Sequence, residues 1–236
     1  MNDEPEEKRR WKKPIEGASS GRGEIAKPVL KKNIRSESSR RWIERQVNDP
    51  YVRRTQAEGW RARSAFKLIE LDDQFKLIKR GARVVDLGAA PGGWAQVALK
   101  RGAKAVVGID LLPIDHLAGA TFLEMDFLDP DAPQKLRALL GGRPDLVLSD
   151  MAANTTGHAR TDQIKTGALA EAAAEFAMEN LAPGGAFVTK AFQGGLDAAL
   201  LTGLKQAFVT VKHAKPPASR SESSEIYVVA QGFRSA

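Results

Sequence analysis

Four aspartates occupy equivalent places in this sequence, because each stands at the end of a short hydrophobic segment. They are Asp86, Asp110, Asp126 and Asp150. In an open α/β sheet the carboxyl ends of parallel strands border the ligand crevice, so side chains at these ends can meet one ligand. One aspartate in such a place is ordinary turn chemistry, but four form an acidic rim. An acidic rim repels a pyrophosphate and attracts a cationic ligand.

The loop after the first of these aspartates is rich in glycine, and residues 86–94 read DLGAAPGGW. A dinucleotide fingerprint requires a second glycine two residues after the first, where this chain has Ala90, and Asp86 would repel a pyrophosphate. Asp110 lies 17 residues after Gly93, about where an acidic side chain binds ribose hydroxyls. The pattern favours S-adenosylmethionine, which carries a sulfonium and an ammonium group, over a nicotinamide dinucleotide. An ordinary turn without a ligand is the alternative.

Three other charged side chains could take part in chemistry at the same edge. Lys190 ends a run suited to a central strand, and burying an unpaired lysine costs on the order of several kcal/mol. It is therefore a candidate general base, and the alternative is a strand-end lysine whose ammonium group reaches solvent. Lys67 lies among the apolar positions of an amphipathic segment, and Glu225 begins the last hydrophobic run. Taken alone, both fit ordinary surface residues.

The elements that must position these residues alternate along the chain. Apolar, β-branched runs predict strands, and apolar residues at helical spacing predict helices between them. The predicted strands are Val84–Asp86, Ala105–Asp110, Phe122–Phe127, Asp145–Asp150, Ala186–Lys190, Phe208–His213 and Ile226–Ala230. The predicted helices are one that begins with Ser64–Glu70 and has Ser64 as its N-cap, and those over Trp94–Leu99, Gln163–Leu181 and Leu196–Ala207. With right-handed crossovers, this alternation predicts an α/β fold with a doubly wound, mostly parallel seven-stranded sheet.

The positive charge of the chain is concentrated before the glycine loop. The formal net charge is +7, with +8 in residues 1–80 and −1 in residues 81–236. Residues 1–40 mix charges with proline, glycine and serine, which predicts a disordered basic tail followed by one domain over residues 41–236. A localised basic region is typical of proteins that bind polyanions, although a solubilising tail has the same composition.

Arginines and aromatic residues interleave after this tail. They are Arg40, Arg41, Trp42, Arg45, Tyr51, Arg53, Arg54, Trp60, Arg61 and Arg63. Guanidinium groups bind phosphates and flat rings stack on bases, so this pattern favours RNA binding. The alternative is a small satellite core in which the rings are packed and the arginines are solvated.

Composition excludes several classes of protein. The chain contains no cysteine, which excludes disulfides and thiolate metal sites and favours a reducing compartment. No run approaches the ~20 apolar residues that a membrane span needs, and we expect a cytoplasmic protein. The three histidines, His116, His158 and His213, are scattered without ligand spacing, so no metal site is expected.

Five motifs, taken in order, resemble those of the FtsJ family of ribosomal RNA 2′-O-methyltransferases. They are Gly59–Lys67, Asp86–Trp94, Ser149–Asn154, Lys190–Gly194 and Glu225–Tyr227. The resemblance runs from about Asp49 to Gly232. It departs from the family at Ala153, where the family usually has proline, and in the length of the tail.

The resemblance implies a Rossmann-like methyltransferase fold and a Lys-Asp-Lys-Glu tetrad, which here falls on Lys67, Asp150, Lys190 and Glu225. Lys190 would be the general base or would orient the ribose hydroxyl, and the other three would position it or the methyl donor. The cofactor would be S-adenosylmethionine, and the residues expected to bind it are Asp86, Gly92, Trp94, Asp110, Asp126 and Asp150.

The resemblance also implies the substrate, which would be a uridine in large-subunit (23S) ribosomal RNA, within the large ribosomal subunit or its precursor. A monomer is expected. Methylation of transfer or messenger RNA, base methylation, a nicotinamide-dependent oxidoreductase and a non-catalytic RNA-binding module are the alternatives.

Overall fold

The structure, a computed structural model, describes residues 48–153, 158–192, 194 and 197–234. The chain divides into two compact units, residues 1–54 and 55–236. The described part of the first unit contains the beginning of helix α2 (Pro50–Glu58), in which the Arg54 guanidinium lies 5.9 Å from the centre of the Tyr51 ring. The predicted tail over residues 1–40 and its boundary with the domain lie outside the described residues.

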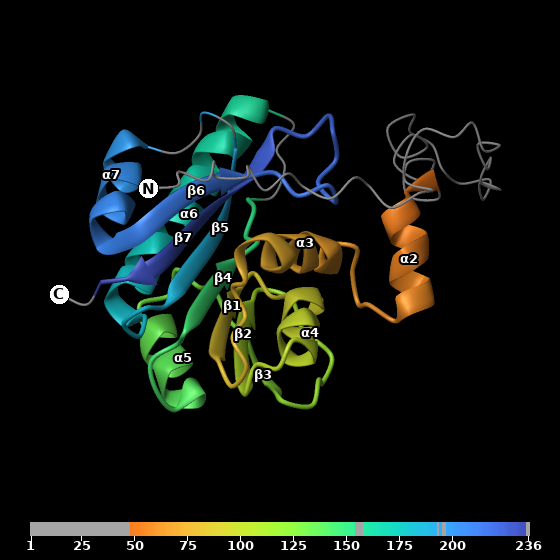
Figure 1. The fold of residues 1–236 in the computed structure, drawn as a ribbon, viewed down its shortest axis with the longest axis horizontal. Helices are drawn as coiled ribbons and strands as arrows, with labels where there is room; N and C mark the ends of the chain where they lie inside the picture. Colours follow the sequence, from red (N-terminus) through yellow and green to blue (C-terminus); the bar gives the residue numbers. More distant parts are fainter. Residues whose placement is uncertain (1–47, 154–157, 193, 195–196, 235–236) are drawn as a thin grey trace, which may run out of the picture. The chain divides into compact units, whose positions relative to one another are not determined.

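One seven-stranded sheet forms the centre of the second unit (Figure 1). The strands are β1 (Arg83–Leu87), β2 (Ala105–Asp110), β3 (Ala120–Glu124), β4 (Leu146–Ser149), β5 (Ala186–Phe192), β6 (Phe208–Ala214) and β7 (Glu225–Phe233), in the spatial order β3-β2-β1-β4-β5-β7-β6. Neighbouring strands are parallel except for β7, which is antiparallel to both β5 and β6. The predicted doubly wound, mostly parallel sheet is confirmed.

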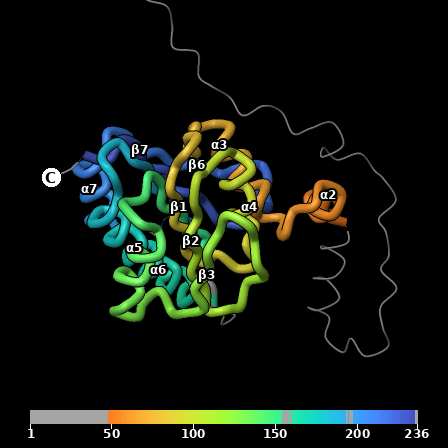
Figure 2. The backbone as a smooth tube through the Cα atoms, turned by 90° about the horizontal axis from the view of Figure 1, so that it is seen from below, coloured from red at the N-terminus to blue at the C-terminus, as the bar shows by residue number. Residues whose placement is uncertain are grey.

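Helices cover both faces of this sheet (Figure 2). Helices α3 (Ala65–Phe75) and α4 (Gly93–Lys100) lie on one side, and α5 (Ala132–Leu140), α6 (Ala159–Asn180) and α7 (Ala198–Ala207) lie on the other. Because both faces are covered, the central strands are apolar on both sides rather than alternating with polar residues. In the described part of the chain, no helix combines the length and the apolar character needed to cross a membrane.

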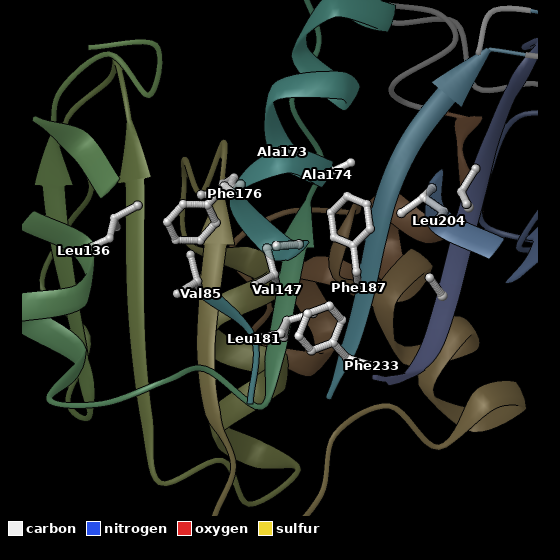
Figure 3. Close-up of a cluster of buried hydrophobic side chains, with 14 of the residues drawn as sticks. Val85, Leu136, Val147, Ala173, Ala174, Phe176, Leu181, Phe187, Leu204 and Phe233 are labelled. Carbon is white, nitrogen blue, oxygen red and sulfur yellow. The ribbon is translucent and has the colours of Figure 1, made fainter. Parts of the chain in front are cut away.

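The larger core lies between the sheet and helices α5, α6 and α7. Val85 and Phe187 project from the strands onto Leu136 of α5, Phe176 of α6 and Leu204 of α7 (Figure 3). All five side chains are buried. Each fully buried aliphatic or aromatic side chain contributes roughly 1.5–3 kcal/mol, so this face supplies much of the stability that keeps the strand ends in register.

The structure differs from the sequence-based expectations at three local points. Helix α5 was not predicted, although its three buried residues, Ala132, Leu136 and Leu140, follow one another at helical spacing. Strand β3 ends at Glu124, so Asp126 lies in the turn that follows, where its carboxylate accepts the Leu128 N–H at 2.9 Å. Ser64 is the N-cap residue of α3, as predicted, but its side chain makes no capping hydrogen bond to the described residues. Its carbonyl oxygen instead accepts the indole N–H of Trp94 at 2.8 Å.

Candidate active site

Four charged side chains from separate parts of the sequence meet at one edge of the sheet. The Lys190 Nζ atom lies 3.0 Å from Asp150 Oδ1, and the Lys67 Nζ atom lies 3.9 Å from the same oxygen. Lys67 Nζ also lies 2.7 Å from Glu225 Oε1. The Lys190 ammonium group donates a further hydrogen bond, of 2.7 Å, to the backbone carbonyl of Asp150. The structure therefore brings together all four residues of the predicted tetrad.

The topology of the sheet explains this convergence. Asp150 follows β4 directly, and Lys190 lies near the carboxyl end of β5, so both occur where parallel strands end. Strand β7 runs the other way, and its register pairs Glu225 with Phe192 and Tyr227 with Lys190. The amino end of β7 therefore lies at the same edge as the carboxyl ends of β4 and β5.

These four side chains are largely withdrawn from solvent. Their exposed fractions are 10% for Lys67, 9% for Lys190, 18% for Asp150 and 14% for Glu225. Two formal positive and two formal negative charges balance in this cluster, as a desolvated group of ions requires. Burial opposes the ionisation of Asp150, but the attraction of Lys190 and then Lys67, with a hydrogen bond from Tyr227, outweighs it and lowers the pKa of Asp150.

Tyr227 joins this cluster and was not predicted as a site residue. Its hydroxyl donates to Asp150 Oδ1 at 2.6 Å and lies 3.3 Å from Glu225 Oε1. Burial, and then the negative charges of Asp150 and Glu225, raise the pKa of Tyr227 well above its usual value, so the hydroxyl stays protonated and remains a donor. Strand alternation could have found it, because residues two apart share one face of a strand.

The serine-rich loop before β7 also contacts the cluster. The hydroxyl of Ser219, which is buried, donates to Glu225 Oε1 at 2.9 Å. Ala218 fixes the loop to two other segments. Its N–H donates to Glu70 of α3 at 2.6 Å, and its carbonyl accepts from Arg63, which precedes α3, at 2.7 Å. Nothing in the local sequence predicts these contacts, since their partners are distant in the chain.

A cavity of about 300 Å³ opens beside Asp150. It is lined by Gly88, Ala90, Ile109, Asp110, Leu111, Met125, Asp126, Phe127, Asp150, Met151, Ala152 and Leu169. The volume is at the lower end of the range for small-molecule sites. Its walls combine apolar side chains with three carboxylates, so it suits a ligand that has a flat apolar part, hydroxyl or amino groups and a positive charge.

Asp110, Asp126 and Asp150, half of the six residues predicted to bind a cofactor, line this cavity. Among the described residues, Asp86, Gly92 and Trp94 are not part of the lining, and their contact with a cofactor stays a prediction. Asp86 lies in β1 before the glycine loop and Trp94 lies in α4 after it, and both side chains are buried. The Trp94 ring packs against Tyr227, with the ring centres 5.8 Å apart. It therefore supports the residue whose hydroxyl binds Asp150.

The Asp86 side chain is completely buried within β1, and neither carboxylate oxygen has a hydrogen-bond partner among the described residues. Burial, and then repulsion from Asp150, raise the pKa of Asp86 to about 8. The backbone N–H of Ala95, in the first turn of α4, partly offsets this rise, although it does not reach the geometry of a hydrogen bond. At neutral pH this carboxyl group is therefore mostly protonated.

The described residues of the predicted RNA-binding segment make contacts within the protein. The Lys100 ammonium group lies 4.1 Å from the centre of the Trp60 ring. Arg61 donates to backbone carbonyls, among them those of Asp115 and His116, and Arg63 donates to that of Ala218. The Trp60 contact fits the alternative of packed rings, whereas Arg61 and Arg63 bind backbone carbonyls, which neither interpretation predicts. Arg40, Arg41, Trp42 and Arg45 lie outside the described residues.

In the part of the chain that the structure describes, no group of three or more histidine, cysteine, aspartate or glutamate side chains could hold a metal ion. The side chains that meet at this site are two lysines, two carboxylates and a tyrosine. Such a set can orient a hydroxyl group, accept its proton and stabilise the charge that develops on its oxygen.

Comparisons with known proteins give consistent results. The family model described as FtsJ-like methyltransferase matches residues 60–233. A relative from Granulibacter bethesdensis, named Ribosomal RNA large subunit methyltransferase E, is 60% identical over 214 residues, which cover 90% of this chain and 93% of the relative. A relative of the same name from Hyphomonas neptunium is 56% identical over 230 residues, which cover 97% and 98% of the two chains.

Among solved structures, a provisionally assigned ribosomal RNA methyltransferase from Plasmodium falciparum superposes with a TM-score of 0.65 at 30% sequence identity. The match covers 74% of this chain and 98% of that one. The part of the present chain that matches is thus nearly the whole of the other protein. The two proteins therefore share the fold that carries the cavity and the charged cluster of the present chain.

Proposed function

Because the chain belongs to the FtsJ-like methyltransferase family, we propose that it transfers the methyl group of S-adenosylmethionine to a ribose 2′-hydroxyl of large-subunit ribosomal RNA, with a uridine as the target. The main support is the meeting of Lys67, Asp150, Lys190 and Glu225 beside a cavity bordered by carboxylates. The names of the relatives support the choice of ribosomal RNA, which would be met within the large subunit or its precursor.

The residues of the cavity fit the proposed cofactor. When bound, S-adenosylmethionine supplies a methyl group attached to a positively charged sulfur. Asp110 and Asp126 offer carboxylate oxygens to hydroxyl and amino groups, and Leu111 and Phe127 offer apolar walls to a flat ring. Asp150 belongs to the tetrad and also lines the cavity, so its negative charge would face the positively charged end of the ligand.

The tetrad would act on the ribose hydroxyl. Lys190 in its neutral amine form would accept the proton of the 2′-hydroxyl; as an ammonium group it would instead orient that hydroxyl and stabilise the negative charge developing on its oxygen. Asp150 fixes the Lys190 ammonium group through both its carboxylate and its carbonyl oxygen. Lys67, paired with Glu225, would position Lys190 and the ribose. Much of the acceleration would come from alignment, because a fixed geometry removes the entropy cost of bringing the reacting atoms together.

The experiment compares wild type with Lys190→Ala, using large-subunit particles and S-adenosylmethionine labelled in its methyl group. We expect Lys190→Ala to abolish transfer while calorimetry shows that it still binds the cofactor. Lys212→Ala is the matched control, because Lys212 is an exposed lysine of the same sheet, on β6. It should methylate as wild type does. Loss of cofactor binding in Lys190→Ala would refute the role proposed for that lysine.

Analysis of the product separates the alternatives. Digestion to nucleosides and mass spectrometry should find the label on a ribose, and a substrate with deoxyribose at the target should give no product, since it lacks the 2′-hydroxyl. A methylated base would contradict the proposal. Parallel assays with free ribosomal RNA and transfer RNA identify the substrate, and label on transfer RNA alone would overturn the choice of ribosomal RNA.

A further inference from the structure

The guanidinium group of Arg61 joins two loops of the molecule. It donates hydrogen bonds to the carbonyl oxygens of Asp115 at 2.7 Å, His116 at 2.6 Å and Pro91 at 3.3 Å. Pro91 belongs to the glycine loop, whereas Asp115 and His116 belong to the loop that follows β2. One side chain therefore holds together two segments that are not adjacent in sequence.

Both of these loops border the cavity. Ala90 of the glycine loop and Leu111 of the loop after β2 are part of its lining. At the cavity itself, the Asp110 carboxylate accepts the Ala90 N–H and the Leu112 N–H, each at 2.9 Å. Asp110 thus binds N–H groups of the same two loops whose carbonyl groups Arg61 binds. The two side chains fasten the loops at different points.

Arg61 is itself held in place. Its backbone N–H donates to the side-chain oxygen of Gln96 at 3.0 Å, and the Gln96 amide donates to the carbonyl of Gly59 at 2.8 Å. The guanidinium also packs closely on Gly92, whose φ is +95°, because a Cβ atom added there would lie 2.8 Å from Arg61 Nη1. A lysine could not reproduce this arrangement, since its single ammonium group lacks the planar fork of an arginine.

We propose that Arg61 is a positioning residue for the cofactor site: by joining the glycine loop to the loop after β2, it keeps the cavity in the form that binds S-adenosylmethionine. This inference rests on the proposed function and adds a role different from the phosphate contact that the sequence predicts for Arg61. The side chain acts through backbone carbonyls of Pro91, Asp115 and His116 and does not need to touch the cofactor.

The test is Arg61→Lys, which keeps the charge and removes the fork. Its matched control is Arg53→Lys, the same change at an exposed arginine of the basic segment. Calorimetry with S-adenosylhomocysteine, without RNA, should show binding about tenfold weaker in Arg61→Lys, as expected when charge-assisted hydrogen bonds that order a site are lost. Arg53→Lys should bind as wild type does. In methylation assays Arg61→Lys should raise the KM for S-adenosylmethionine and leave kcat unchanged.

A second measurement follows the loops directly. Backbone amides over residues 111–117 should exchange hydrogen for deuterium faster in Arg61→Lys than in wild type, while those of β1 and β4 should not change. If Arg61→Lys does not fold, Arg61→Gln, which retains an N–H donor of smaller reach, is measured in the same way.

Three outcomes are decisive. Unchanged S-adenosylhomocysteine binding in the folded variant would overturn the inference. Weaker RNA binding with a smaller salt dependence, at unchanged cofactor affinity, would return Arg61 to the phosphate-binding role. If wild type itself binds no S-adenosylhomocysteine and transfers no methyl group, the proposed function fails. The inference about Arg61, by contrast, is tested by the difference between the variant and wild type.

Discussion

The buried carboxyl group of Asp86 should make this protein less stable as the pH rises through the neutral range. The pKa of Asp86 is about 8 in the folded protein, against 3.8 for an ordinary aspartate, because burial and repulsion from Asp150 disfavour its charged form. Between these two values the folded chain retains a proton that the unfolded chain has lost. The free energy of unfolding must therefore fall with increasing pH in that window.

The size of the effect follows from the same two pKa values. Each unit of difference is worth about 1.4 kcal/mol, so stability should fall by that amount per pH unit inside the window. From pH 5 to pH 8 the loss is about 4 kcal/mol, a large part of the ~5–15 kcal/mol that stabilises a typical domain. The contribution of Asp86 is fully present below the ordinary pKa of an aspartate, and above the folded value nothing further is lost.

The assay is urea unfolding at pH 5, 6, 7 and 8, followed by tryptophan fluorescence, to which the buried Trp94 contributes, and compared between wild type and Asp86→Asn. The asparagine keeps the size of the side chain and does not titrate, so other ionisable groups cancel in the difference between the two proteins. We expect Asp86→Asn to gain about 4 kcal/mol relative to wild type from pH 5 to pH 8. Parallel pH profiles would refute the assignment of a protonated carboxyl group to Asp86.

Two further predictions concern the tetrad and the packing of the sheet. Tyr227→Phe removes the hydrogen bonds to Asp150 and Glu225 and keeps the ring, so kcat should fall roughly 10- to 100-fold while the calorimetric affinity for S-adenosylmethionine stays the same. An unchanged kcat would contradict the role given to this hydroxyl. Gly108→Ala in β2 would bring a Cβ atom within 2.7 and 2.8 Å of two neighbouring side chains, so thermal unfolding should show a loss of about 1–3 kcal/mol. Its control, Gly203→Ala in α7, has open space around the new methyl group and should gain about 0.5–1 kcal/mol; equal effects at the two positions would count against the packing argument.

The architecture could be predicted because the sequence pattern of a parallel strand recurs several times along the chain. Apolar runs that end in aspartate mark the parallel strands, and the topology then places Asp110 and Asp150 at one edge. Lys190 could be singled out as a lysine in a central strand. Lys67 and Glu225 could not be selected from the residues alone, because their pairing at 2.7 Å depends on a helix and a strand that are far apart in the chain.

Arginine partners were the least predictable part of the site. The residue type indicates a phosphate contact, but the guanidinium of Arg61 reaches the carbonyl of Asp115, which is 54 residues away in sequence. A local pattern carries no information about such a partner. Similarly, Tyr227 in a strand is typical of core packing, and only its neighbours show that its hydroxyl serves a carboxylate.

The position of β7 between β5 and β6 has a consequence for the nascent polypeptide. Strand β6 pairs only with β7 among the described strands, so it cannot join the sheet until residues 225–233 have been synthesised. Before that moment Lys67 and Lys190 would share Asp150 as their one acidic neighbour from the tetrad, without Glu225. A chain that lacks residues 225–233 lacks both Glu225 and Tyr227, so we expect methyl transfer only after β7 has taken its place between β5 and β6.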